Sequence, residues 1–181
     1  MSYKRWIFIA IFLFGIALVF GLATPTGISL PAEYIAALKE LSGILVPFNA
    51  LTVILIFAKN TSTLLLSFAL SPIFCLVPIL VLTVNGWLLA VISVTVIQEK
   101  SLGFLLAGLL PHGIFELPAL ILGQAAALSF GTMAILALFK RERRNLLLPS
   151  LKQNLRYLMV ALVLLLPAAF IETYITPLLL G

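Results

Sequence analysis

The feature that most limits the fold of this chain is the length of its charge-free apolar segments. Residues 6–32, 41–58, 60–98 and 117–139 contain no Asp, Glu, Lys or Arg. A helix needs roughly 20 apolar residues to cross the hydrocarbon core of a bilayer. Backbone groups in hydrocarbon must bond to one another, and these runs lack the alternating polarity of a membrane barrel. The sequence therefore predicts an all-α polytopic transmembrane bundle.

The composition excludes a soluble globular domain. The 181 residues are 63% apolar and 9% charged, whereas about 25% of the residues in ordinary soluble domains are charged. The net charge of +5 comes from basic clusters beside apolar runs, which indicates orientation in a membrane. We therefore expect the lipid bilayer as a partner, no nucleic acid and no cofactor. A single cysteine, Cys75, excludes an intrachain disulfide.

The apolar runs predict a single transmembrane domain over residues 1–181, with about five crossings formed by five or six helices. Two of the segments exceed the length of one crossing. Asn85-Gly86 and Pro111-His112-Gly113 interrupt them, and proline and glycine weaken or break helices. We therefore expect discontinuous or re-entrant helices at these two points. A short surface helix is predicted over 31–41, and the predicted spans are 6–23, 43–58, 64–97, 102–139 and 157–176.

Basic residues predict the orientation of the chain. Lys4 and Arg5 precede the first span, and the loop before the last span holds six more lysines and arginines between Lys140 and Arg156. Both clusters should face the cytoplasm, which places the N-terminus inside and the C-terminus outside a cell membrane. The N-terminal segment also fits a secretory signal, but the later apolar runs favour a retained helix.

Three ionisable residues lie within the predicted spans: His112, Glu116 and Glu172. Charged groups in hydrocarbon are costly and usually paired or functional. His112 and Glu116 are four residues apart, on one face of a helix, where they could bind a metal, relay a proton or form an internal hydrogen bond. A structural alternative places Glu116 in the first turn of a helix that starts near Pro111 and Gly113, where it would cap free backbone N–H groups.

Asparagines supply a second polar group. Asn60 and the pair Asn85-Gly86 lie inside apolar sequence. A buried asparagine needs partners for its oxygen and its amide hydrogens. These residues are either polar links between helices or part of a binding site at discontinuous helices.

Small residues recur every fourth position in the segment 102–139. A stripe of this kind lets another helix approach closely. It predicts packing within the chain or between two copies, so a homodimer is one expected arrangement. The stripe consists of Ala119, Gly123, Ala127 and Gly131.

The string Pro-His-Gly-Ile-Phe-Glu-Leu at 111–117 resembles the stage II sporulation protein M family, an integral membrane family. The continuation to Ala126, the residues Asn60 and Asn85-Gly86, the basic loop 140–144 and the end 168–177 resemble it too. One departure is the stretch between the two asparagines, which the family keeps glycine-rich. Here that stretch holds Ser67, Ser71, Pro72 and Pro78.

The resemblance implies a membrane protein that works with partners. In spore-forming bacteria the family's namesake acts at the division septum, in a membrane complex with peptidoglycan-degrading enzymes that it anchors or organises. The leading interpretation is therefore a non-enzymatic membrane component that organises partner proteins. The alternative is a small transporter or channel that uses the intramembrane His, Glu and Asn residues. An intramembrane hydrolase using His112 and Glu116 has the least support, because no hydrolase motif is present.

Overall fold

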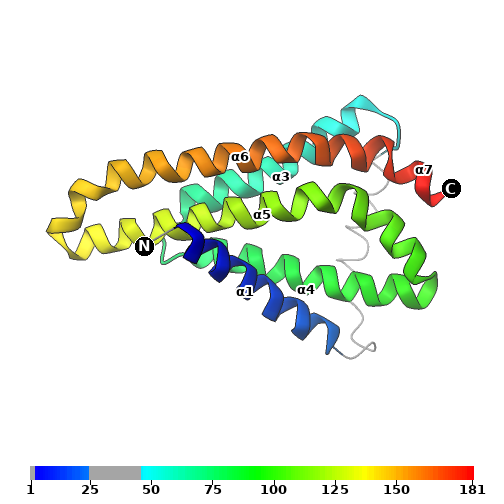
Figure 1. Cartoon of the computed structure of the whole chain (residues 1–181), viewed down its shortest axis with the longest axis horizontal. Coiled ribbons are helices and arrows are strands. Elements are labelled where there is room, and N and C mark those ends of the chain that lie inside the picture. Colours follow the sequence, from blue (N-terminus) through cyan, green and yellow to red (C-terminus); the bar gives the residue numbers. More distant parts are fainter. Residues whose placement is uncertain (1–2, 25–45) are drawn as a thin grey trace.

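The computed structural model describes residues 3–24 and 46–181, and in these ranges the chain is helical without a strand (Figure 1). This confirms the predicted all-α fold. The elements are α1 (Tyr3–Leu22), α3 (Ala50–Leu70), α4 (Leu76–Glu99), α5 (Leu102–Phe139), the 3-10 helix η1 (Arg141–Leu146), α6 (Leu147–Tyr174) and α7 (Thr176–Leu180).

Five helices of the described part are long and apolar enough to cross a membrane: α1, α3, α4, α5 and the η1–α6 unit. Their outer faces remain apolar. Phe8, Ile54 and Val163 are each more than half exposed, as lipid-facing side chains are. Water would solvate such a surface poorly, so the chain is a membrane protein.

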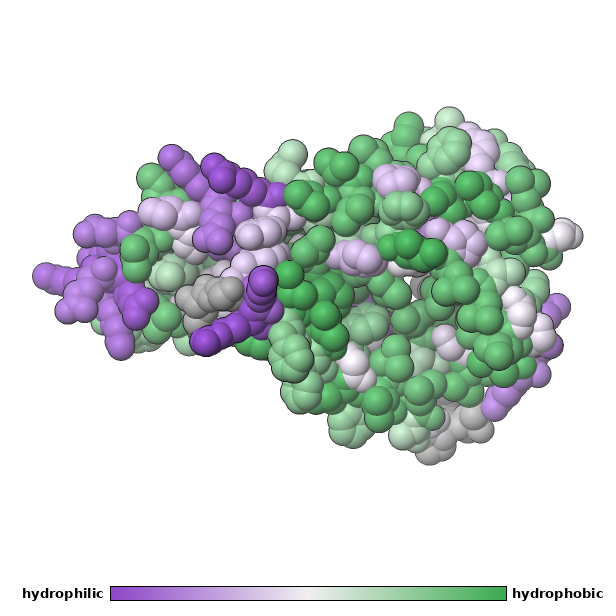
Figure 2. Space-filling model, in the orientation of Figure 1, coloured by the Kyte–Doolittle hydropathy of each residue, from purple (hydrophilic) through white to green (hydrophobic). Residues whose placement is uncertain are grey.

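Consecutive long helices run in alternating directions (Figure 1). α5 lies at the centre, packs most extensively against α6 and also contacts α1, α3 and α4. The basic 3-10 helix η1 connects α5 to α6 at one end of the bundle, and the C-terminal helix α7 lies at the other. Figure 2 shows hydrophilic surface gathered over the η1 end, while most of the remaining visible face is hydrophobic.

The second span differs from its predicted bounds. The sequence predicted a connection between 43–58 and 64–97, yet α3 continues without interruption to Leu70. The polar side chains in this stretch bond within the membrane-spanning unit: Thr63 Oγ1 donates to the Lys59 carbonyl of its own helix. The chain turns instead at 71–75, after α3, where Phe74 and Cys75 have positive φ. The surface helix predicted over 31–41 and the start of the span 43–58 lie outside the described residues.

The predicted break at Asn85-Gly86 does not occur, because α4 is helical from Leu76 to Glu99. The Asn85 side chain donates from Nδ2 to the Val81 carbonyl, one turn back in the same helix, at 2.7 Å. Gly86 lies against α1, where a Cβ atom would stand 2.5 Å from the Phe14 carbonyl oxygen. The pair therefore does not interrupt α4: Asn85 bonds within the helix, and Gly86 allows α1 to approach it.

The second predicted interruption is a bend. α5 is one helix of 38 residues that includes Pro111 and Pro118, and Figure 1 shows its first turns bending sharply away from the rest. Each proline removes a backbone donor and pushes on the preceding turn. The bend directs the face that carries His112 and Glu116 toward α6.

The small-residue stripe packs inside the chain. Ala119 and Ala127 are fully buried. A Cβ on Gly123 would meet Leu64 of α3, and one on Gly131 would meet Ser71 and Cys75 of the following turn. The stripe therefore lets α3 and its C-terminal turn approach α5 closely.

Candidate functional site

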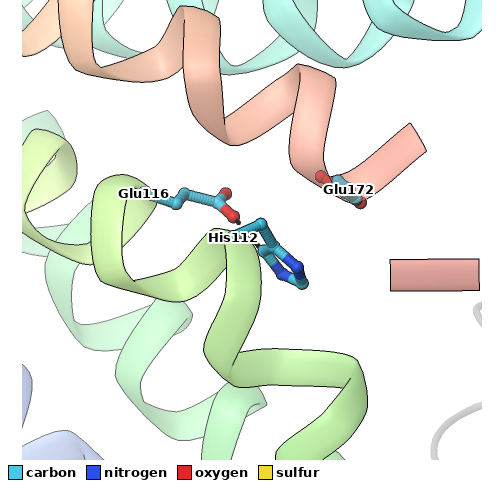
Figure 3. Close-up of side chains that lie close together, drawn as sticks. All are labelled: His112, Glu116 and Glu172. Carbon is cyan, nitrogen blue, oxygen red and sulfur yellow. Dashed lines mark ion pairs between the residues drawn. The ribbon is translucent and has the colours of Figure 1, made fainter. Parts of the chain in front are cut away.

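Three helices and the start of a fourth place polar side chains around one point. Asn60 comes from α3, His112 and Glu116 from α5, Glu172 from the last turn of α6, and Thr176 from the start of α7. Figure 3 shows the His112 ring and the Glu116 carboxylate on the bent part of α5, with Glu172 facing them from α6.

The ionisable groups lie close together. One ligand atom from each of His112, Glu116 and Glu172 lies within 4.8 Å of the others. His112 Nε2 is 3.9 Å from Glu116 Oε2. The three side chains are partly buried, and those of His112 and Glu116 are 13% and 33% exposed. The three side chains therefore lie between helices without being fully buried.

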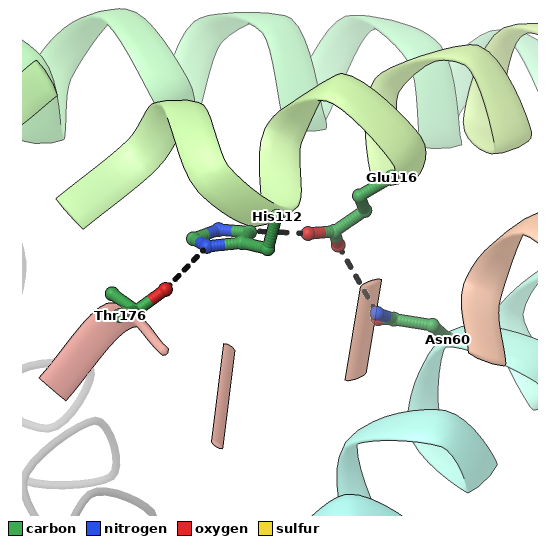
Figure 4. A network of polar contacts seen from close by, with 4 residues as sticks. All are labelled: Asn60, His112, Glu116 and Thr176. Carbon is green, nitrogen blue, oxygen red and sulfur yellow. Dashed lines mark hydrogen bonds and ion pairs between the residues drawn. The ribbon is translucent and has the colours of Figure 1, made fainter. Parts of the chain in front are cut away.

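Two neutral residues, Asn60 and Thr176, contact Glu116 and His112 at the polar atoms that these two side chains do not direct at each other (Figure 4). Asn60 Nδ2 donates to Glu116 Oε1 at 3.1 Å. His112 Nδ1 lies 3.4 Å from the hydroxyl of Thr176. Each contact uses one polar atom of an ionisable residue, and the second polar atom of that residue, Glu116 Oε2 or His112 Nε2, faces the other ionisable side chain.

The position of Asn60 along α3 indicates how deep in the membrane the cluster lies. This residue lies ten positions from either end of α3, so a spanning α3 carries it to the middle of the hydrocarbon core. The hydrogen bond to Asn60 brings the Glu116 carboxylate to the same depth. His112 and Thr176 lie on the side of α7, the end of the bundle opposite the basic η1 segment.

The capping interpretation of Glu116 is wrong. α5 begins at Leu102, with the Ser101 side chain accepting from the Phe104 N–H, so Glu116 lies four turns inside the helix. The backbone donors around it are already used by helical hydrogen bonds. The carboxylate therefore has no free helix end to satisfy, and its side-chain neighbours determine its role.

Asn85, the second asparagine, borders the site through a cavity that it shares with Glu116. Asn85 and Glu116 line a cavity of about 110 Å³ between α1, α4 and α5. The two residues share this space without a direct hydrogen bond among the described contacts, since the Asn85 amide donates to its own helix. Glu116 thus borders both the cluster and the cavity, whose other lining residues are Phe14, Leu89, Leu109, Gly113, Leu117 and Leu120.

Sequence reasoning missed two residues near the site. Thr176 follows Glu172 by four positions, the spacing that places two side chains on one helix face, and this was the available signal. Lys59 precedes Asn60 and is exposed near the middle of α3. It falls between the predicted spans 43–58 and 64–97, because a charge between two apolar runs is typical of a loop.

The arrangement suits cation chemistry. Two carboxylates and an imidazole offer oxygen and nitrogen lone pairs to a proton or a metal ion. Carboxylates at mid-membrane depth are costly unless a positive charge or a hydrogen-bond donor balances them. Within residues 3–24 and 46–181, the group of side chains able to hold a metal is His112, Glu116 and Glu172.

Comparison with known proteins agrees with this architecture. The sequence model of the family described as stage II sporulation protein M matches residues 7–177. An uncharacterized protein of Methanocaldococcus jannaschii is 27% identical over 174 residues, covering 94% of this chain and 93% of that protein. No solved structure matches the chain significantly. The family match covers all five long apolar helices and the polar cluster between them, and the chain belongs to the stage II sporulation protein M family.

Proposed function

We propose that this protein is a small membrane transporter or channel that passes a cation through the polar cluster between α3, α5 and α6. One observation carries the proposal: one ligand atom from each of three ionisable residues lies within 4.8 Å of the others, and one of the three, Glu116, bonds to Asn60 at the middle of α3. Intramembrane ionisable residues that face the bundle interior commonly mark ion pathways. The geometry favours this function over partner organisation, because the small-residue stripe is used within the chain.

A sequence of polar groups supports a route into the protein from the α7 end. Thr176 contacts His112, His112 faces Glu116, and Glu116 borders the cavity that Asn85 also lines. These groups lead from the α7 end of the bundle toward its interior. The basic residues of η1 and the start of α6 gather at the opposite end, which supports an orientation with that end in the cytoplasm.

Flux measurements in proteoliposomes test the proposal. The protein is reconstituted, and the uptake of protons, Na⁺ and divalent cations is compared with that of empty vesicles. We expect flux of at least one cation, reduced to the empty-vesicle level by Glu116→Gln. Glu99→Gln is the matched control, because Glu99 is exposed at the end of α4 and its substitution should leave flux unchanged. Wild-type vesicles that leak no faster than empty ones would refute the proposal.

A second function, organisation of membrane partners, is favoured by the outer face of α3. Lys59 and Ser62 are exposed there, one turn apart, between exposed apolar residues such as Ile54 and Leu66. The charge of Lys59 acts on Glu172 within the chain, and the exposed part of its side chain leaves it able to meet an acidic group on a partner helix as well. We expect Lys59→Leu to reduce the recovery of membrane partners in mild detergent. Lys100→Leu, at the end of α4, should not, and equal recovery from both variants would count against this function.

A further inference from the structure

We infer that the cation held by the cluster is a divalent transition-metal ion of the zinc class, bound by His112 Nε2, Glu116 and Glu172. The inference rests on the proposed function to the extent that both place a cation at this site. It goes further by naming the class of ion and its ligands. The three ligand atoms lie within 4.8 Å of one another, on two packed helices.

The donor set selects among cations. Imidazole nitrogen suits zinc, copper, iron and nickel, whereas magnesium and calcium prefer oxygen ligands alone. His112 is the only histidine of the chain, and it lies beside the two carboxylates. One imidazole with two carboxylates also leaves a coordination position open, as in zinc sites that bind water or an exchanging ligand.

Charge favours a cation at this site. Two ionised carboxylates carry a charge of −2 into a region of low dielectric, where an uncompensated charge is costly. The positive charge of Lys59 acts on Glu172 and offsets part of it. A bound cation compensates the remainder, and the imidazole in the donor set selects the zinc class.

The surrounding hydrogen bonds orient the ligand atoms. Metal-binding histidines almost always have their second ring nitrogen hydrogen-bonded, and ligating carboxylates are themselves hydrogen-bonded. Here Nδ1 of His112 lies 3.4 Å from the Thr176 hydroxyl, which leaves Nε2 toward Glu116. Asn60 donates to Oε1 of Glu116, which leaves Oε2 toward the imidazole.

The spacing requires only small side-chain movement. Zinc bonds to nitrogen and oxygen of roughly 2.0–2.2 Å place neighbouring tetrahedral ligand atoms about 3.4 Å apart. His112 Nε2 and Glu116 Oε2 are already 3.9 Å apart. None of the three side chains is locked in the fully buried core, so rotation of the Glu172 carboxylate toward the other two completes the site.

Binding to the purified full-length protein tests the inference. The protein in detergent or nanodiscs is stripped with a chelator, dialysed and titrated with Zn²⁺, and with Co²⁺ followed by its visible absorption. We expect one equivalent of each ion and a Co²⁺ spectrum typical of nitrogen and oxygen ligands. His112→Ala and Glu172→Gln should abolish stoichiometric binding. Thr176→Val, which touches only the second ring nitrogen, should weaken it about 10–100-fold.

The controls separate loss of the site from loss of folding. Glu99→Gln should bind the metal like the wild type, and each variant should keep the wild-type helical circular dichroism and elution volume. Wild-type protein that binds no Zn²⁺ stoichiometrically would overturn the inference, and so would a folded His112→Ala variant that binds it equally well. If Zn²⁺ does not bind but Glu116-dependent proton or Na⁺ flux occurs, the inference falls and the proposed function stands. Zn²⁺ binding without any flux supports the inference and refutes transport.

Discussion

The contact of Gly86 with α1 gives a stability prediction whose size follows from the structure. A Cβ atom at this position would lie 2.5 Å from the Phe14 carbonyl oxygen and 3.3 Å from the Ala17 Cβ. Ordinary contact needs about 3.4 Å or more, so Gly86→Ala forces α1 and α4 apart by about 0.9 Å. Overpacking of this kind lowers the free energy of unfolding by about 1–3 kcal/mol. The better helix propensity of alanine offsets at most about 1 kcal/mol of this loss. We expect a net loss of about 1–2 kcal/mol.

Gly15 of α1 supplies the matched control. Among the residues that the structure describes, no atom outside its own helix lies within 4 Å of a Cβ built there, so Gly15→Ala should be neutral or stabilise by up to about 1 kcal/mol. Both variants are unfolded reversibly in mixed micelles by increasing the fraction of SDS, with helical circular dichroism as the signal. If Gly86→Ala is as stable as Gly15→Ala, α1 and α4 do not approach each other as described.

Two further substitutions probe links between helices in the same unfolding assay. Ser67→Ala removes the hydrogen bond from the Ser67 hydroxyl to Gln124 Oε1, between α3 and α5, and leaves the buried Gln124 side-chain oxygen without this donor. We expect a loss of about 1–2 kcal/mol, most of which Gln124→Met should abolish in the double variant. Tyr3→Phe removes the bond from Tyr3 to the Leu122 carbonyl but keeps the ring stacked on Tyr157. It should cost about 0.5–1.5 kcal/mol, and Tyr157→Ala, which removes the stack, should cost more.

The sequence predicted the class of fold well, because the bilayer leaves few choices. A long apolar run must form a helix to satisfy its backbone in hydrocarbon, and five helices long and apolar enough to cross a membrane are present in the described ranges. The spacing of His112 and Glu116 also predicted their shared helix face, which the continuous helix α5 confirms.

Helix boundaries were less predictable, because a polar residue in a membrane chain can mark a loop or can lie inside a spanning helix. The sequence around Asn60 resembles a loop in composition, yet it continues α3, and Asn60 bonds to Glu116 of α5. Asn85 and Gly86 resemble a break, yet one bonds to its own helix and the other packs against α1. Whether such a residue ends a helix or contacts another one depends on the neighbouring helices. The local sequence pattern carries no information about those neighbours.

The meeting of Glu172 with His112 and Glu116 could not be predicted for the same reason. Sixty residues separate Glu172 from His112, and their approach depends on the bend of α5 and on the way α6 packs against it. Thr176 joins the cluster only because α7 begins directly after α6.

Cross-linking between α5 and α6 in native membranes tests most directly whether this polar site exists. Cysteines replace His112 and Glu172 in a Cys75→Ala background, and a short thiol cross-linker is applied before disruption of the membrane. The side chains replaced have ligand atoms within 4.8 Å of each other, so we predict efficient intramolecular cross-linking. The control pair joins Glu172→Cys with Ile114→Cys, whose side chain is 65% exposed on another face of α5, and it should not react. Absence of cross-linking in the first pair, or equal cross-linking in both, would contradict the assembly of these residues into one site.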